Sequence, residues 1–99
     1  MTIHGITIDE TKLEQLCRSH HIRRLALFGS VLGPSFGPES DVDVLVEFEP
    51  GHVPGLGFFT IQDALSALIG RDVDLHTPAF LSRYFRSEVE AEAEVLYAA

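Results

Sequence analysis

The sequence is poor in cysteine, in basic side chains and in long apolar runs, and each scarcity excludes a class of protein. Cys17 is the only cysteine among 99 residues, so neither a disulfide framework nor a cysteine zinc cluster is expected. No stretch approaches the roughly 18 consecutive apolar residues of a membrane span. The first five residues also lack the basic-then-apolar pattern of a signal peptide. We therefore expect a cytoplasmic protein with no membrane partner.

Acidic residues clearly outnumber basic ones. Seven Lys and Arg stand against fifteen Asp and Glu, which gives a formal net charge of −8. Proteins that bind DNA or RNA normally present a basic face that displaces counterions from the phosphates. The sequence has no basic run, so we expect no direct nucleic-acid partner. If the chain handles a phosphate, a metal ion must supply much of the positive charge.

Helical and strand patterns alternate along the chain. Asp9 is suited to cap the first helix, and Gly70 is suited to end the second. We predict helices from Asp9 to about His21 and over 58–69, strands over 22–28, 41–49 and 72–76, and turn-rich connections at 31–40 and 50–57. From Ala79 onward the pattern is again helical, with a helical tail over 88–94 and expected buried contacts at Phe80, Leu81, Tyr84 and Phe85.

This order of elements indicates an α/β fold of the two-layer α+β kind, with three strands in one sheet. Residues 1–99 suit one domain, since domains typically hold roughly 100 to 150 residues. Alternation along the second strand points Val42, Val44 and Val46 toward the helices. The other face of that strand should be polar and should carry the functional site.

Two pairs of aspartates are the most informative feature. Period-two geometry puts Asp41 and Asp43 on one face of the second strand, about 7 Å apart, and Asp72 and Asp74 repeat the arrangement on the third. If the strands are neighbours, three or four carboxylates converge. Two like charges at 4 Å repel by about 4 kcal/mol at an effective dielectric near 20. Such a cluster needs a counter-charge, and its hard oxygen ligands suit one or two Mg²⁺ ions.

A candidate phosphate cradle lies upstream, at Leu27-Phe28-Gly29-Ser30. A strand ends there, Gly29 permits a tight turn, and Ser30 stands where a short helix could begin. Backbone N–H groups and a hydroxyl at a helix N-terminus bind phosphate. Either feature alone is weak, because Asp-x-Asp is more often a solvated strand face and Gly-Ser is usually only a turn. Together they are far more specific.

Gly29-Ser30 and Asp41-Val42-Asp43 stand ten residues apart, and this spacing resembles the Gly-Ser-x10-Asp-x-Asp signature of the DNA polymerase beta-like nucleotidyltransferases. More narrowly, the chain resembles the minimal nucleotidyltransferase antitoxins that are paired with HEPN-type toxins. Residues 70–75, Gly-Arg-Asp-Val-Asp-Leu, resemble their third-carboxylate strand. The similarity covers nearly the whole chain, although Asp72 matches no catalytic position.

The resemblance implies a nucleotidyltransferase core with a mixed three-stranded sheet and helices mainly on one face. It assigns Gly29 and Ser30 to the triphosphate of ATP, and Asp41 and Asp43 to Mg²⁺. It makes Asp74 a further metal ligand or the general base that takes the acceptor's proton. The implied reaction is the transfer of AMP from ATP to a tyrosine hydroxyl of a HEPN-type toxin, which is thereby silenced.

Residues 31–34 depart from the family pattern. Val31, Leu32, Gly33 and Pro34 stand where relatives commonly carry an Arg-Ala-Arg-Gly-like stretch that could neutralise phosphate charge. The missing arginines support a second hypothesis, a binding module that neutralises its partner by contact. A third is a subunit of a small-molecule nucleotidyltransferase. The sequence leaves the choice among the three open, as well as a homodimer or a hetero-oligomer.

The histidines carry less information. His20 and His21 close the first helix, where a cation suits the helix dipole, and no third ligand stands at useful spacing. We therefore favour a helix-end role over metal binding. His76 falls on the Asp74 face, where we favour a strand-end role over contact with nucleotide or acceptor. Cys17 lies on an apolar helix stripe and should be part of the core.

Overall fold

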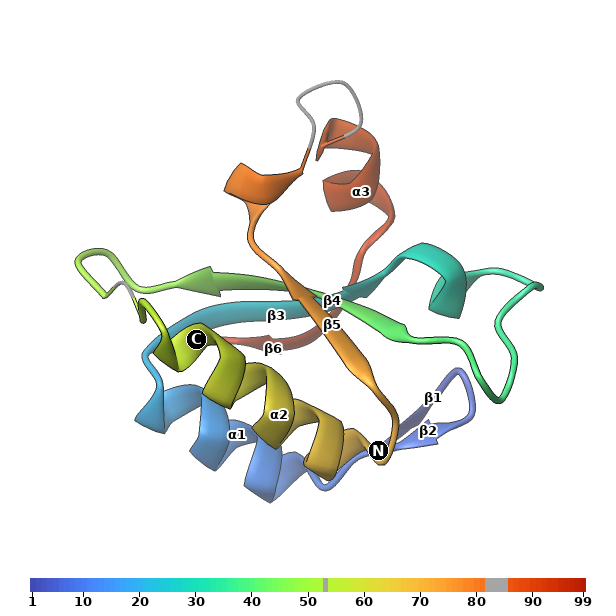
Figure 1. Ribbon diagram of the computed structural model, residues 1–99, viewed down its shortest axis with the longest axis horizontal. Coiled ribbons are helices and arrows are strands. Elements are labelled where there is room, and N and C mark those ends of the chain that lie inside the picture. The colour runs from blue at the N-terminus through green and yellow to red at the C-terminus, as the bar shows by residue number, and fades with distance from the viewer. Residues whose placement is uncertain (53, 82–85) are drawn as a thin grey trace.

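A mixed β-sheet forms the centre of the fold (Figure 1). The computed structural model describes residues 1–52, 54–81 and 86–99. Within these residues, a four-stranded sheet has the order β5-β4-β3-β6, and a separate hairpin joins β1 to β2. In chain order the elements are β1 (Thr2–Ile3), β2 (Ile6–Thr7), α1 (Glu10–Ser19), β3 (Ile22–Phe28), the 3-10 helix η1 (Gly29–Leu32), β4 (Val42–Phe48), α2 (Gly57–Ile69), β5 (Val73–His76), the 3-10 helix η2 (Pro78–Phe80), α3 (Arg86–Glu92) and β6 (Glu94–Ala98).

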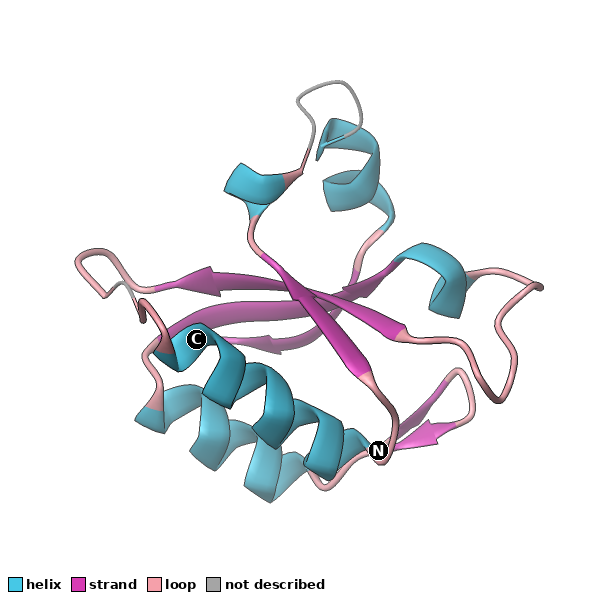
Figure 2. Ribbon diagram, viewed as in Figure 1, coloured by secondary structure: helices cyan, strands magenta, loops and turns pink. Residues whose placement is uncertain are grey.

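The two longer helices, α1 and α2, lie side by side against one face of the sheet, and α3 lies on the other (Figure 2). The main core forms between them, where Val42, Val44 and Val46 of β4 are fully buried. Their helix partners are Leu13 and Cys17 of α1 and Ile61, Leu65 and Ile69 of α2. The α/β fold class and the inward face of β4 are thus confirmed.

Local signals in the sequence explain where the helices begin and end. The Asp9 side chain accepts a hydrogen bond from the backbone N–H of Lys12 and caps α1. Gly70 ends α2 in the left-handed conformation, with φ of 76°. Burial raises the pKa of the Cys17 thiol to about 12, in keeping with its predicted core role. No helix among the described residues is long and apolar enough to cross a membrane.

Two expectations need correction. The sheet has a fourth strand, β6, where no strand was predicted, and β6 pairs antiparallel with β3. The C-terminal helical pattern is also broken: η2 and α3 are separate, with Leu81 buried, while Tyr84 and Phe85 lie outside the described residues and the Phe80 side chain is not described. The helical tail predicted over 88–94 is largely present as α3, whereas β6 follows it from Glu94, where the open edge of β3 offers a ladder of hydrogen bonds.

The outer face of β4 is less polar than predicted. Leu45 is 1% exposed and packs with Phe28 and Leu81, and Val89 and Ala93 pack against this second small core. Leu81, Val89 and Ala93 therefore cover part of the face that carries Asp43. The site lies at the rim of an apolar layer and not on a fully solvated surface.

The same leucine-to-alanine substitution at a buried and at an exposed position tests the core assignment. Leu65→Ala should lower the free energy of unfolding by about 2–5 kcal/mol, because Leu65 is 0% exposed and its removal leaves a cavity. Leu56→Ala is the control, since Leu56 is 86% exposed, and should stay within about 0.5 kcal/mol of the parent. Urea titration followed by circular dichroism measures both. Equal losses would contradict the core described above.

Candidate active site

The pairing of two strands brings two aspartates together. β4 and β5 run parallel, and their register sets Asp43 opposite Asp74. On the other side of β4, Asp43 pairs with Phe28, the last residue of β3. The end of β3, the start of β4 and the middle of β5 thus meet, and the chain turns into η1 directly beside Asp43.

His76 belongs to the same group. The ligand atoms of Asp43, Asp74 and His76 all lie within 4.8 Å of one another. His76 Nε2 is 3.2 Å from Asp74 Oδ2 and 3.5 Å from Asp43 Oδ1. It is buried and has no partner with hydrogen-bond geometry among the described residues. Alternation correctly placed His76 on the Asp74 face. The strand-end role that we favoured omits its contact with the two aspartates.

The cluster shifts the pKa of Asp43. Burial raises the pKa of its carboxyl above the ordinary value; His76 acts to lower it, while the nearby charges of Asp74 and Asp41 raise it further. The ionised form is therefore disfavoured overall in the folded protein. A cation beside Asp43 would reverse that balance, because positive charge favours the carboxylate.

Gly29 is fitted to the space beside this carboxylate. Its φ is +75°, in the left-handed region, and a Cβ built on it would collide with the Asp43 carboxylate. Glycine is thus required here both by conformation and by close approach. Ser30 follows in η1 with its residue exposed. The short helix that the sequence predicted after β3 is present as this single 3-10 turn.

Asp41 stands slightly apart. It is exposed, precedes β4 by one residue, and lies outside the group formed by Asp43, Asp74 and His76. Of the predicted site residues, the structure brings Gly29, Asp43 and Asp74 together, whereas Asp41 and Ser30 flank them on exposed backbone. Their roles remain predictions.

An arginine that sequence reasoning passed over shapes the approach to β4. Arg71 Nη2 donates to the carbonyl oxygens of Gly37, at 2.6 Å, and of Ser40, at 2.7 Å. Its guanidinium also lies 4.6 Å from the centre of the Phe36 ring. These contacts tie the long connection after η1 to the start of β5, and so fix the chain immediately before Asp41.

The residues present fit a divalent cation. Asp43 and Asp74 supply carboxylate oxygens, which suit Mg²⁺, and Asp41 adds negative charge nearby. The buried and unsatisfied Nε2 of His76 faces the same group. Beside them, Gly29 brings the backbone of the turn into close contact with the Asp43 carboxylate.

One protein family matches most of this chain. Residues 10–96 match the family model described as nucleotidyltransferase domain. A protein of Methanocaldococcus jannaschii named "putative protein adenylyltransferase" is 34% identical over 80 residues, which cover 78% of this chain and 79% of the relative. The chain spans most of that protein's length.

Solved structures share the fold. One, assigned as a minimal nucleotidyltransferase, is 31% identical with a TM-score of 0.69, and the match covers 89% of this chain and 87% of the other. Another comes from the complex of a tri-AMPylated Shewanella oneidensis HEPN toxin with an MNT antitoxin. It is 21% identical with a TM-score of 0.63, covers 91% of this chain and 70% of the other, and supports the fold alone.

Removing the Asp43 charge should stabilise the metal-free protein in a pH-dependent way. Because folding raises this pKa, the unfolded chain ionises first as pH rises, and the parent then loses stability that Asp43→Asn retains. The variant should melt at a higher temperature at neutral pH. The gap should close below the ordinary pKa of 3.8. Thermal melts in a chelator measure it, with Asp63→Asn on the exposed face of α2 as the charge control.

Two glycines with almost the same backbone separate conformation from close approach. Gly29 and Gly70 have φ of +75° and +76°, but nothing lies within 4 Å of a Cβ at Gly70. Gly70→Ala should cost about 1–2 kcal/mol of stability, the usual penalty of the left-handed region. Gly29→Ala should cost more, because the methyl group also meets the Asp43 carboxylate. Denaturant unfolding of both variants tests this, and equal costs would contradict the close contact.

Proposed function

This chain belongs to the nucleotidyltransferase domain family, and we propose that it transfers AMP from ATP to a hydroxyl group of a partner protein, a HEPN-type toxin that is neutralised by the modification. The observation that carries the proposal is the meeting of Asp43 and Asp74, from two adjacent strands, beside the side-chain-free turn at Gly29. That arrangement sets carboxylates for a divalent cation next to the backbone turn that would hold the phosphates.

In the proposed reaction, Asp41, Asp43 and Asp74 hold Mg²⁺, which when bound supplies positive charge against the triphosphate. The backbone at Gly29 and the hydroxyl of Ser30 hold the phosphates. The acceptor oxygen forms a bond to the α-phosphorus, the bond from that phosphorus to the bridging oxygen breaks, and pyrophosphate leaves. The hydroxyl proton passes to the Asp74 carboxylate, which is more exposed than that of Asp43.

The choice of a protein acceptor rests on the relatives. The Methanocaldococcus jannaschii protein, of which the chain spans 79%, takes its name from protein adenylyl transfer. A chain of the same fold occurs in complex with an AMPylated HEPN toxin. The motifs of this sequence and their spacing also resemble those of the minimal nucleotidyltransferase antitoxins.

One feature favours the second candidate, neutralisation by contact alone. Val31, at a position where the family pattern carries an arginine, is 2% exposed and is part of the main core. Position 31 is therefore committed to packing and cannot supply charge to a phosphate. An acidic protein of net charge −8 could instead mask a basic site on its partner.

Labelled ATP separates catalysis from contact. With Mg²⁺ and the product of the neighbouring gene, the parent should transfer label to the partner. Asp41→Ala with Asp43→Ala should reduce the transfer at least a hundredfold, because the cation loses its ligands; removal of one electrostatic catalytic group typically costs about 10²–10³ in rate. Asp72→Ala is the matched control and should retain transfer, since Asp72 is exposed and lies outside the cluster.

The same variants decide between the two candidates. If the double variant stays folded but no longer protects cells from the partner, protection depends on catalysis. Protection that survives without label transfer would favour the contact mechanism. Transfer of label to a small molecule in the absence of any partner would contradict both and support the small-molecule enzyme.

A further inference from the structure

A second group of ligating side chains lies at the other end of β4. It contains His21, at the end of α1, and Glu49 and His52, which follow β4. At about 3.3 Å per residue, the strand separates Glu49 from Asp43 by roughly 20 Å. The group is therefore distinct from the candidate active site, and the proposed function uses none of its members.

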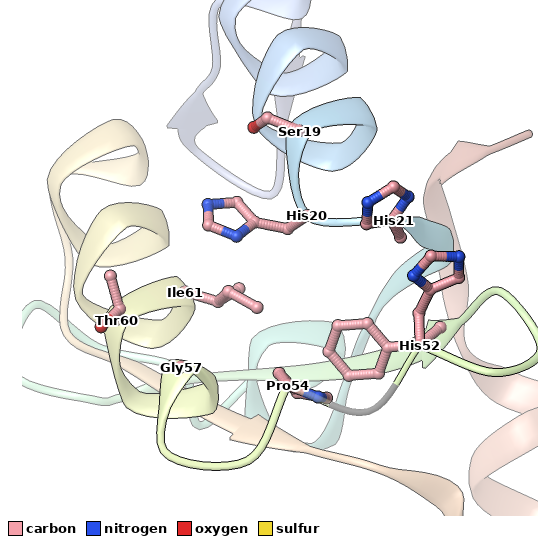
Figure 3. Close-up of a pocket in the computed structure, with 9 residues that line it drawn as sticks. Ser19, His20, His21, His52, Pro54, Gly57, Thr60 and Ile61 are labelled. Carbon is pink, nitrogen blue, oxygen red and sulfur yellow. The ribbon is translucent and has the colours of Figure 1, made fainter.

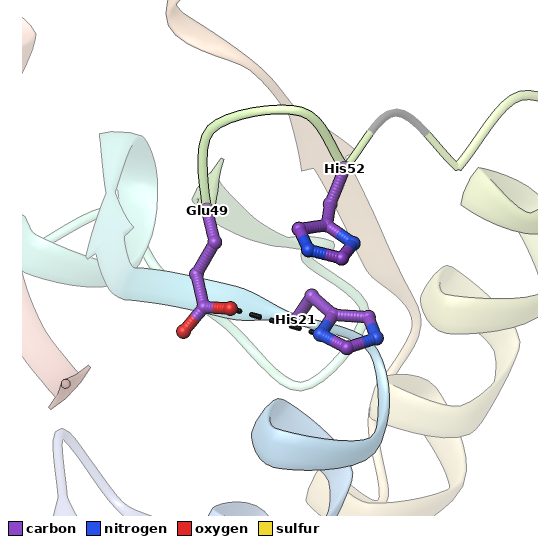
Figure 4. Close-up of side chains that lie close together, drawn as sticks. All are labelled: His21, Glu49 and His52. Carbon is purple, nitrogen blue, oxygen red and sulfur yellow. Dashed lines mark ion pairs between the residues drawn. The ribbon is translucent and has the colours of Figure 1, made fainter.

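The three side chains converge although the sequence keeps them apart. Their ligand atoms all lie within 4.8 Å of one another, and His21 Nδ1 is 3.6 Å from Glu49 Oε2 (Figure 4). The rings of His21 and His52 are stacked, with centroids 3.8 Å apart and planes 15° from parallel. Figure 4 shows both rings and the carboxylate gathered at one point of the surface.

The backbone holds the two ends of this group in register. The N–H of Glu49 donates to the carbonyl oxygen of His21 at 2.8 Å, and the N–H of His52 donates to that of Glu49 at 3.1 Å. His21 has φ of +54°, in the region that a residue following a helix usually reaches as glycine or asparagine. The histidine ring thus projects from a left-handed position just after the helix, beside Glu49 and His52.

An open cavity of about 300 Å³ adjoins the group and is lined in part by His20, His21, His52 and Thr60 (Figure 3). Figure 3 shows the rings of His21 and His52 side by side, whereas the ring of His20 extends away from them. Solvent therefore reaches both histidine rings, and the cavity leaves room for water beside them.

We propose that His21, Glu49 and His52 form a second metal site, one that takes a transition-metal ion of the zinc class. Two imidazoles and one carboxylate suit Zn²⁺, Ni²⁺ or Cu²⁺, whereas Mg²⁺ prefers oxygen ligands. Three protein ligands and an open position are also a common zinc arrangement. The two sites differ in chemistry: the Asp43 site is mainly carboxylate and the His21 site mainly imidazole.

Binding requires one rearrangement. Stacked rings hold their in-plane nitrogen lone pairs in two nearly parallel planes, so both cannot point at one ion. With bonds of about 2.1 Å, ligand atoms around tetrahedral zinc lie roughly 3.4 Å apart. The ligand atoms of this group are separated by up to 4.8 Å, so they must move closer together. The His52 residue is exposed, and its ring can turn out of the stack without disturbing the core. The bound ion then joins the end of α1 to the segment after β4.

Residue-resolved spectra of the histidine rings test the proposal. With Mg²⁺ in excess, Zn²⁺ should shift the ring nitrogens of His21 and His52 and saturate at one equivalent per chain. His4 and His20 should not shift, and His76 reports separately on the candidate active site. Shifts confined to His76, or none at low stoichiometry, would overturn the proposal.

Variants at neighbouring histidines provide the matched comparison. His21→Asn and His52→Asn should each weaken Zn²⁺ affinity, measured by calorimetry, by roughly tenfold or more. Asn tolerates the positive φ at position 21, so the fold is kept. His20→Asn is the control and should bind as the parent does. Zn²⁺ should raise the melting temperature of the parent and of His20→Asn but not of His21→Asn. Equal weakening by all three substitutions would mean scattered surface binding.

Discussion

Parallel pairing of β4 with β5 sets Asp43 beside Asp74, and the chemistry of the site follows from that register. The pairing holds because the other faces of the same strands are apolar: Val42, Val44 and Leu75 are nearly or fully buried. Each such side chain contributes about 1.5–3 kcal/mol on burial, comparable with the repulsion of about 4 kcal/mol between close carboxylates. Hydrophobic packing on one face therefore keeps like charges together on the other.

The turn after β3 shows the same division between packing and chemistry. Gly29 faces the Asp43 carboxylate and has no room for a side chain, while Val31, two residues later, is buried in the core. A single 3-10 turn thus both closes the apolar layer and exposes backbone beside the aspartates. An arginine at position 31 would have to leave that layer, so its absence is a consequence of how η1 packs here.

Most of the fold could be predicted because its elements carry local signals. Asp9 marks the start of α1, Gly29 the end of β3 and Gly70 the end of α2. Period-two alternation marks β5. β6 was not predicted, since its pairing with β3 is non-local. The His21 group was missed for a similar reason: Ile22 pairs with Phe48, and only that antiparallel register makes His21 and Glu49 neighbours. Pairing the two predicted strands side by side and antiparallel, with the start of one beside the end of the other, places His21 next to Glu49.

Each arginine among the described residues already has a hydrogen-bond or ion-pair partner. Arg23 and Arg24 both pair with Glu47, Arg18 pairs with Glu14, and Arg71 is engaged by backbone carbonyls. Arg86, the remaining arginine among the described residues, donates to the carbonyl of Leu81. None of these arginines forms an ion pair with Asp43 or Asp74, so within the described residues a bound metal ion would be the counter-charge nearest to an anionic ligand there.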